Sequence, residues 1–515
     1  MSRKYFATGV ALIIMLFVTS VVGAQALPGS GWYSSVVIQN VGATAIDANG
    51  ARIDVYTSSA TPSSVTFGLA VGQSRTFIAG SNGQGGNLDV SPPLPSGTNG
   101  SAVISAPQPI VAIGSIQNNQ IPGISGPGVS GGNANGQFRG ASQGSTSIFY
   151  PVVKNNYVNR KTVFSIQAVG GDATITASIR SSTGQTYNFG PTTITANRSI
   201  ILDPSSFSPP MPSTSCGNVI ATSPCFGALT VTASSGQIAG TYIEFQVGQS
   251  PAQIVLAASM LSADDADDQI YCPNIKNEYV RRSTGMSVFN TSTSPVRVDV
   301  TYKVTDGPNA GSTYTRNDVE IPARSSVVFS RFDTGTLGGM PENNLASATI
   351  KLRGSTNDVL LAVVNEANLL DGQRVRATAY TCFGAKSATA KIAAPIFKRD
   401  LAGVTSGLVV QNVSDQAFTL RATFTCGTTT PTTVTINTPS PVDPGASYLF
   451  SGFVRDDNRI LMSGVPFRQL CSVIVTGGDG SNPNYKIVGI AQETAQFGTA
   501  QPNLDNKNYE AFNLP

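Results

Sequence analysis

The chain has no histidine, and this absence excludes most of the familiar catalytic arrangements. A Ser-His-Asp triad, a Cys-His pair and the histidine-ligated zinc sites all need an imidazole. Charged residues are scarce as well, at 12% of 515 residues, and Trp32 is the only tryptophan, so a multi-aromatic sugar platform is poorly supplied. We predict no catalytic residue and no cofactor. Paired carboxylates, as in glycosidases, are the acid–base chemistry that the composition leaves open.

The N-terminal residues are typical of a secretory signal. Arg3 and Lys4 precede an apolar run over residues 10–18, and small residues around Ala24 and Ala26 offer two cleavage positions. The run is short for a membrane span of about 20 residues, and no second long apolar run follows. Cysteine is absent before Cys216, which excludes a lipid-modified N-terminal cysteine. We therefore predict a signal peptide over residues 1–26 and a secreted or cell-surface protein without a membrane span.

The balance of charge gives no sign of a nucleic-acid partner. Loss of Arg3 and Lys4 with the signal peptide lowers the formal net charge from +3 to +1. A near-neutral chain has no electrostatic footprint for nucleic acid or anionic lipid.

A short motif recurs at a fixed long interval. The interval between copies is 122 positions in both cases, and the markers are Pro151 and Lys154, Pro273 and Lys276, and Pro395 and Lys398. Another motif, Gln39-Asn40, returns as Gln411-Asn412, with Asn290 lying 122 positions before Asn412. A fixed period of this length indicates a repeated domain.

Short runs of alternating apolar and polar residues fill each repeat. Residues 296–304 and 346–353 alternate in this way, with turn residues between them. This pattern is typical of antiparallel sheets packed on one face, and it favours four tandem immunoglobulin-like β-sandwich domains over a parallel β-helix. The predicted boundaries are residues 27–119, 148–268, 269–389 and 390–515. Residues 120–147, rich in Gly, Ser and Asn, are predicted to form a flexible linker or long surface loop.

Six cysteines in an exported chain favour disulfides. Bonds within repeats require no bridge between domains, and they would pair Cys216 with Cys225, Cys272 with Cys382, and Cys426 with Cys471. No Cys-x-x-Cys occurs, so we predict no metal site at these residues.

The remaining polar motifs are interpreted as structural. We expect each proline to lie at a strand edge and each following lysine to be solvated, which would protect that edge from pairing. Gln39-Asn40 and Gln411-Asn412 are expected to orient a strand end or an inter-domain turn, and the glycosylation triplets that begin at Asn290 and Asn412 are interpreted as chance matches. The acidic run comprises Asp264, Asp265, Asp267 and Asp268. It is interpreted as a solvated connection between repeats, with a calcium site as the alternative.

The segments 395–398 and 406–412 resemble repeat units of large exported surface proteins of filamentous bacteria. Those units are immunoglobulin-type sandwiches with a Pro-x-x-Lys start and a V-x-N strand. Repeat 1 lacks the Pro-x-x-Lys start, and repeat 2 has Gln167-Ala168 in place of Gln-Asn. The resemblance implies an exported bacterial protein with a non-catalytic role, and it supplies no functional residue.

The sequence thus predicts a non-catalytic protein with a structural, adhesive or spacer role. The expected partner is a cell-envelope or surface component, by glycan binding or self-association. The alternatives are a carbohydrate-binding envelope protein and a filament subunit assembled by strand exchange. In the last case, signal cleavage would remove the first strand of repeat 1, and the C-terminal tail of a neighbouring chain would fill the edge. A shortened strand supplied by residues 27–31 is the alternative to that exchange.

Overall fold

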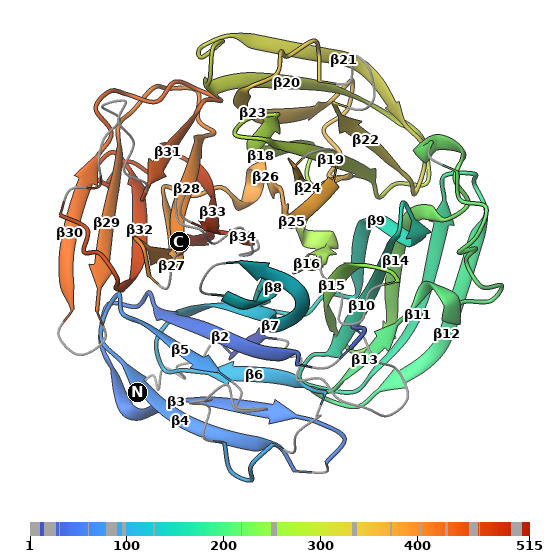
Figure 1. Ribbon diagram of the computed structural model, residues 1–515, viewed down its shortest axis with the longest axis horizontal. Coiled ribbons are helices and arrows are strands. Elements are labelled where there is room, and N and C mark those ends of the chain that lie inside the picture. Colours follow the sequence, from blue (N-terminus) through green and yellow to red (C-terminus); the bar gives the residue numbers. More distant parts are fainter. Residues whose placement is uncertain are drawn as a thin grey trace, which may run out of the picture.

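Four β-sandwiches follow one another around a common centre in the computed structural model (Figure 1). The structure describes residues 11–14, 27–29, 31–59, 61–78, 90–94, 99–126, 129–217, 219–248, 255–331, 337–370, 373–401, 404–427, 431–452, 462, 464–495 and 507–514. These residues form strands and four short 3-10 turns and contain no α-helix. The turns are η1 (Pro204–Ser206), η2 (Ile220–Thr222), η3 (Ala263–Asp265) and η4 (Ala385–Ser387). The predicted all-β class is confirmed.

Repeat 3 shows the sandwich most clearly. Its outer sheet has the order β21 (Thr313–Ile321), β20 (Val296–Asp306), β23 (Asn344–Leu352), β18 (Gln269–Asn277) and β26 (Phe383–Gly384). Its inner sheet has the order β22 (Ser326–Ser330), β19 (Arg282–Asn290), β24 (Leu360–Leu370) and β25 (Gln373–Thr381). Along β20, Val298, Val300 and Tyr302 are fully buried while the residues between them are partly exposed. The alternation in the sequence therefore places one apolar face between the two sheets.

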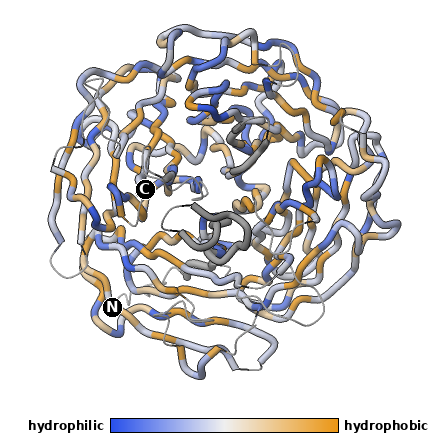
Figure 2. The backbone as a smooth tube through the Cα atoms, viewed as in Figure 1, coloured by the Kyte–Doolittle hydropathy of each residue, from blue (hydrophilic) through white to orange (hydrophobic). Residues whose placement is uncertain are grey.

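Repeats 1 and 4 have the same two-sheet plan. In repeat 4 the outer sheet has the order β30 (Thr432–Asn437), β29 (Leu420–Cys426), β32 (Leu470–Gly477), β27 (Lys391–Lys398) and β35 (Phe512–Leu514). The inner sheet has the order β31 (Ser447–Ser451), β28 (Val404–Asn412), β33 (Ile487–Ala495) and β34 (Lys507–Glu510). In repeat 1 the outer sheet has the order β1 (Ala11–Ile14), β6 (Ser101–Ser105), β3 (Ile46–Tyr56) and β4 (Ser63–Leu69). The inner sheet has the order β5 (Ser74–Ile78), β2 (Tyr33–Asn40), β7 (Ile110–Gly126) and β8 (Val129–Arg139). Hydrophobic segments recur in all four repeats (Figure 2).

Repeat 2 joins its two sheets into one path. The order is β12 (Thr186–Ile194), β11 (Ala173–Ser181), β14 (Phe226–Ser235), β9 (Ser147–Tyr157), β10 (Arg160–Ala168), β15 (Ile238–Gln246) and β16 (Val255–Ser259). Two short strands, β13 (Ser199–Leu202) and β17 (Leu261–Ser262), pair with β10 and β9. The join is the hairpin in which Tyr157 lies opposite Arg160.

Neighbouring repeats share their hydrophobic cores all the way around the ring. Buried residues of repeat 2 pack with Phe289 and Val363 of repeat 3, and those of repeat 3 pack with Val488 of repeat 4. Repeat 1 packs against Ile243 of repeat 2 on one side. On its other side, its Ile113 belongs to the core of repeat 4. The first and last repeats therefore meet, and the ring is closed.

The contact that closes the ring is of the same kind as contacts between successive repeats. A buried serine hydroxyl donates to the carbonyl of a left-handed turn residue in the next repeat. The pairs are Ser101 with Asn197 at 2.5 Å and Ser347 with Gly445 at 2.6 Å. Ser472 of repeat 4 makes this bond to Gly72 of repeat 1 at 2.5 Å. The closing interface thus repeats the geometry of covalently linked neighbours.

The centre of the ring is lined by the last inner strand of each repeat. One of these strands, β8, lies in the segment that was predicted to be a linker. β8 contacts β16 and β34, and β25 contacts the same two strands. β8 lies within residues 120–147, where a linker without strands was expected. A Cβ atom at Gly136 would lie 2.6 Å from the Ala257 Cβ, so glycine permits the close approach of β8 to β16. Gly136 thus belongs to a closely packed strand, not to a linker.

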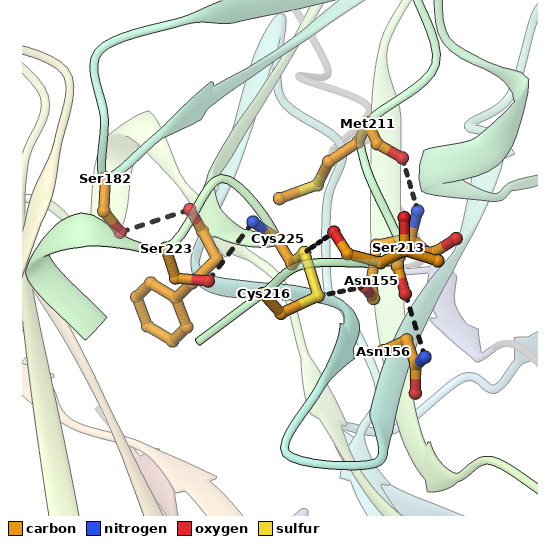
Figure 3. The surroundings of a disulfide bond; sticks show 10 residues. Asn155, Asn156, Ser182, Met211, Ser213, Cys216, Ser223 and Cys225 are labelled. Atoms are coloured by element: carbon orange, nitrogen blue, oxygen red, sulfur yellow. Dashed lines mark hydrogen bonds between the residues drawn. A yellow bond between two sulfur atoms is a disulfide. The ribbon is translucent and has the colours of Figure 1, made fainter. Parts of the chain in front are cut away.

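The cysteines form disulfides within repeats, as the positions favoured. The bonds join Cys216 to Cys225, Cys272 to Cys382, and Cys426 to Cys471, with sequence separations of 9, 110 and 45 residues. Around the first of these, Asn155 and Asn156 donate from their side chains to the carbonyls of Met211 and Ser213, at 2.6 and 2.9 Å (Figure 3). This disulfide therefore belongs to a loop of repeat 2 that side-chain hydrogen bonds also hold in place.

Most of the predicted signal peptide lies outside the described residues. Its residues 11–14 form β1, which pairs antiparallel with β6. Among the described residues, no helix is long and apolar enough to span a membrane.

Candidate functional site

The three marker lysines form a repeated set of ion pairs on the inner side of the sandwiches. Lys154 pairs with Glu244, Lys276 with Glu366, and Lys398 with Glu493, and the Nζ–oxygen distance is 2.8 Å in each pair. The lysine side chains are 13%, 3% and 20% exposed, and the glutamates are 2% exposed or less. The expectation of solvated lysines was therefore wrong.

The edge position expected for these residues was also wrong, because the first strand is flanked on both sides in repeats 2, 3 and 4, which carry the lysines. In repeat 2, β9 lies between β14 and β10. β18 lies between β23 and β26, and β27 lies between β32 and β35. Pro151, Pro273 and Pro395 are buried, and the pairing register shifts at each of them. Proline fits here because a β-bulge leaves one residue without a ladder hydrogen bond.

Two of these bulges are each held by the hydroxyl of a tyrosine on a strand that lines the centre of the ring. The Tyr380 hydroxyl donates to the Asn274 carbonyl at 2.8 Å and accepts from the Asn274 amide at 3.3 Å. The Tyr509 hydroxyl makes the matching bonds to Ile396, at 2.5 and 3.0 Å. Burial raises the pKa of both tyrosines well above the usual value, so they act as neutral hydrogen-bonding groups.

The lysine of repeat 3 extends into a network that crosses into repeat 4. Lys276 donates to Glu366 and to Gln492 of repeat 4, at 2.8 Å in both cases. Gln492 donates in turn to Glu366 at 2.9 Å, and Arg282 lies 3.3 Å from the same carboxylate. Arg282 also donates to Thr494 of repeat 4 at 2.5 Å. These charges hold the interface between the two repeats.

Burial and neighbouring charges shift the pKa values of the groups in this network in opposite directions. Burial lowers the pKa of Lys276 to about 8, although Glu366 favours its charged form. Burial alone would raise the pKa of Glu366, but Lys276 and Arg282 outweigh it and hold that pKa below its usual range. Glu493 behaves alike, because Lys398 and Lys507 outweigh its burial and lower its pKa. Glu366 and Glu493 therefore stay ionised at neutral pH.

Repeat 1 lacks both halves of this pair. In the other repeats the glutamate lies opposite Thr162, Thr284 or Ser406 on the neighbouring strand. The matching residue of repeat 1, Ser34, lies opposite Ile116. The glutamates were missed from the sequence, although Glu244 and Glu366 are 122 positions apart and carry the same repeat signal as the lysines.

The repeated asparagines fasten turns, as predicted. The Asn290 side chain donates to Ser294 and accepts from the Ser292 amide, at 2.7 and 2.8 Å. Asn412 makes the matching bonds to Gln416 and Ser414, at 2.7 and 2.9 Å. Both side chains are fully buried, so neither glycosylation triplet presents its amide to solvent.

The acidic run divides into two structural roles. Asp265 accepts from the amide and hydroxyl of Ser262, both at 2.7 Å, and so caps η3. Asp267 and Asp268 approach Asp358, with carboxylate oxygens within 4.8 Å of one another. Asp267 already accepts from the amides of Asp268 and Lys386, at 2.8 and 2.7 Å. Asp267 connects two repeats, because its backbone bridges to Leu360 of repeat 3, but it is 2% exposed, so the predicted solvated connection was wrong for this residue.

The described residues line cavities on repeat 3 and between the repeats. One, of about 700 Å³, lies on repeat 3 beside the exposed side chains of Arg297, Asp318 and Arg353. The other, of about 540 Å³, draws its lining from all four repeats. Its polar walls include Gln143, Gln167, Thr241 and Asp264. The Gln167 side chain is fully buried, and its carbonyl oxygen has no hydrogen-bond partner within the described part of the chain.

Comparisons with known proteins identify no family. No family model and no curated protein matches the chain. Among solved structures, the crystal structure of Thermotoga maritima 1070 has 9% identity and a TM-score of 0.19, with 23% of this chain and 96% of that chain covered. A tetra-tandem repeat from the extending region of a large adhesion protein has 11% identity and a TM-score of 0.10, with 91% and 92% covered. The fold itself defines the class, a closed ring of four β-sandwich repeats.

Proposed function

We propose that this chain is an exported, non-catalytic ring with a structural or adhesive role outside the cell. The observation that carries the proposal is the use of the buried charges. Lys276, Glu366 and Arg282 join repeat 3 to repeat 4, and Glu493 accepts from Gln137 of repeat 1 at 3.4 Å. These groups hold the repeats together and lie away from solvent, which supports a scaffold rather than a reaction centre.

Three disulfides support the extracellular location, because such bonds persist in oxidising compartments. A closed ring gives less support to a spacer role, since its repeats do not extend end to end. The ring instead offers a rigid body whose outer sheets are available for attachment.

The test is binding of the purified mature protein to cell envelopes of the organism that encodes it. We expect saturable co-sedimentation with the envelopes, which disappears when the protein is unfolded. Turnover of ester, glycoside, phosphoester or peptide reporters, abolished by a point substitution in this chain, would contradict the proposal.

Carbohydrate binding is a second candidate, supported by the polar cavity of about 540 Å³. The exposed polar side chains of Gln143 and Asp264 in its lining suit a ligand rich in hydroxyl groups. A glycan array probed with the mature protein is expected to give a signal that falls in an Asp264→Ala variant. An array without signal above background would remove this candidate.

A further inference from the structure

The first strand of repeat 1 comes from the segment that signal cleavage is predicted to remove. In repeat 3, β18 lies on β23 with Ile270 opposite Ile350 and Cys272 opposite Ala348. In repeat 1, β1 lies on β6 in a matching way, with Leu12 opposite Ile104 and Ile14 opposite Ala102. Residues 11–14 thus occupy the position that β9, β18 and β27 hold in the other repeats.

The described residues after the cleavage region supply no replacement strand. Residues 27–29 form a bend, and the next described strand is β2, which belongs to the other sheet. Leu27 and Trp32 are buried in the core of repeat 1, and Trp32 donates to the Pro28 carbonyl at 3.0 Å. Of the shortened strand expected over residues 27–31, the described residues 27–29 and 31 form no strand. Without β1, the edge of β6 and the buried side chains of Ala102 and Ile104 lose their cover.

A second copy of the mature chain cannot fill the position without opening another. Each mature chain has three first strands, β9, β18 and β27, for four such positions. Exchange between copies would only move the open position to another repeat. The C-terminal tail is already in use, because β34 pairs with β33 and β35 pairs with β27. The predicted exchange through that tail is therefore disfavoured.

The chemistry of the position specifies its occupant. In repeats 2 to 4 the first strand brings a lysine to a buried glutamate. In repeat 1 the glutamate is replaced by Ile116, which is 1% exposed. A lysine brought there would be desolvated without a carboxylate, which is strongly unfavourable. The position therefore takes a strand that is apolar where the others carry lysine.

We infer that the mature protein binds one extended apolar strand of a partner protein, paired antiparallel with β6. Strand addition of this kind obtains affinity from main-chain hydrogen bonds and specificity from alternate side chains. The inference rests on the proposed export and on removal of the signal peptide. It gives the attachment role a defined docking point: the β6 edge of repeat 1.

The test uses residues 27–515 and labelled peptides derived from β27, residues 391–398. A peptide with Lys398→Leu is compared with the unchanged peptide by fluorescence anisotropy. We expect one saturable site per chain, with at least tenfold tighter binding of the Lys398→Leu peptide. An Ile116→Glu protein is expected to reverse this order, because the glutamate then pairs with Lys398. Equal binding of both peptides, or the same order in Ile116→Glu, would overturn the inference.

A second variant guards against misfolding of Ile116→Glu. The strand of residues 391–397 is fused ahead of Leu27 through a Gly/Ser linker. This chain is expected to melt at a higher temperature than the mature protein and to bind no peptide. Equal melting temperatures, together with β6 amides that exchange without protection in both chains, would also overturn the inference. Self-association of the mature protein that added peptide does not reverse would overturn it as well.

N-terminal sequencing of the exported protein separates this inference from the proposal beneath it. Retention of residues 1–26 would remove the proposed processing itself. A correctly cleaved chain that binds no strand would leave the proposed function in place and overturn only the docking point.

Discussion

Lys276 is a buried charge at the interface between repeats 3 and 4. It faces Glu366 within repeat 3 and Gln492 of repeat 4, and it is 3% exposed. Removing one partner of a buried pair leaves the other charge uncompensated, at a cost of about 3–5 kcal/mol. The residue therefore controls how firmly the two repeats are joined.

We predict that Lys276→Met lowers the free energy of unfolding by about 3–5 kcal/mol, measured by guanidinium denaturation. Lys386→Met is the matched control, because Lys386 pairs with Asp358 at an exposed site and its loss is expected to change stability little. A double variant, Lys276→Met with Glu366→Leu, is expected to recover part of the loss. Equal effects of Lys276→Met and Lys386→Met would contradict the buried-pair account.

The glutamates of this network also predict a pH dependence. The folded chain holds the pKa of Glu366 and Glu493 below the usual value of 4.5. Each group therefore binds fewer protons when folded, and its stabilising effect is complete above pH 4.5 and is lost as the pH falls through the folded pKa. Glu366→Gln is expected to lose less unfolding free energy between pH 7 and pH 3 than the unchanged protein. A variant that loses as much over this range would show that Glu366 does not contribute.

At the scale of elements, the strands that alternate in sequence were predictable and the central strand β8 was not. The alternation of β20 follows directly from a sandwich with one buried face. β8 contains Gly131, Gly132 and Gly136, residues that weaken a strand unless another backbone comes close. The partner that makes glycine suitable, Ala257, is 121 positions from Gly136, and no local pattern reports it.

Gly136→Ala tests this close approach. The new Cβ would lie 2.6 Å from the Ala257 Cβ and 2.7 Å from its amide nitrogen, so backbone must move. We expect a loss of about 1–3 kcal/mol by thermal or chemical unfolding. Gly171→Ala is the control, because a Cβ atom at that position would meet no heavy atom within 4 Å. If both substitutions have the same small effect, β8 does not pack against β16 as described.

The lysine–glutamate pairs lie between these cases. The period of 122 positions identified the lysines as repeated, but their partners lie 90, 90 and 95 positions further along the chain. Charge alone favoured solvent for Lys154, Lys276 and Lys398, because a lysine is rarely buried without a partner. In the sequence, the partner glutamates could be found only because glutamate also recurs at the repeat period, at Glu244 and Glu366.

At the scale of the whole molecule, the repeats were predictable and their closure was not. Three of the repeats follow from the spacing of Pro151, Pro273 and Pro395, and the first follows from Gln39-Asn40, which returns as Gln411-Asn412. Closure depends on the angle between neighbours, which is set by contacts such as Ser347 with Gly445. Because Ser472 makes the matching contact to Gly72, the angle accumulated over four repeats brings the last back to the first. No periodicity in the sequence carries that angle.

Small-angle X-ray scattering of the oxidised, mature protein tests the closed ring most directly. A compact body of about 490 residues has a radius of gyration of about 23 Å, and the closed ring is expected to lie near this value. Four domains of this size arranged in line would give about 40 Å. A value near 23 Å for the monomer supports the ring. A value near 40 Å would contradict it, because repeats 1 and 4 would then be apart in solution.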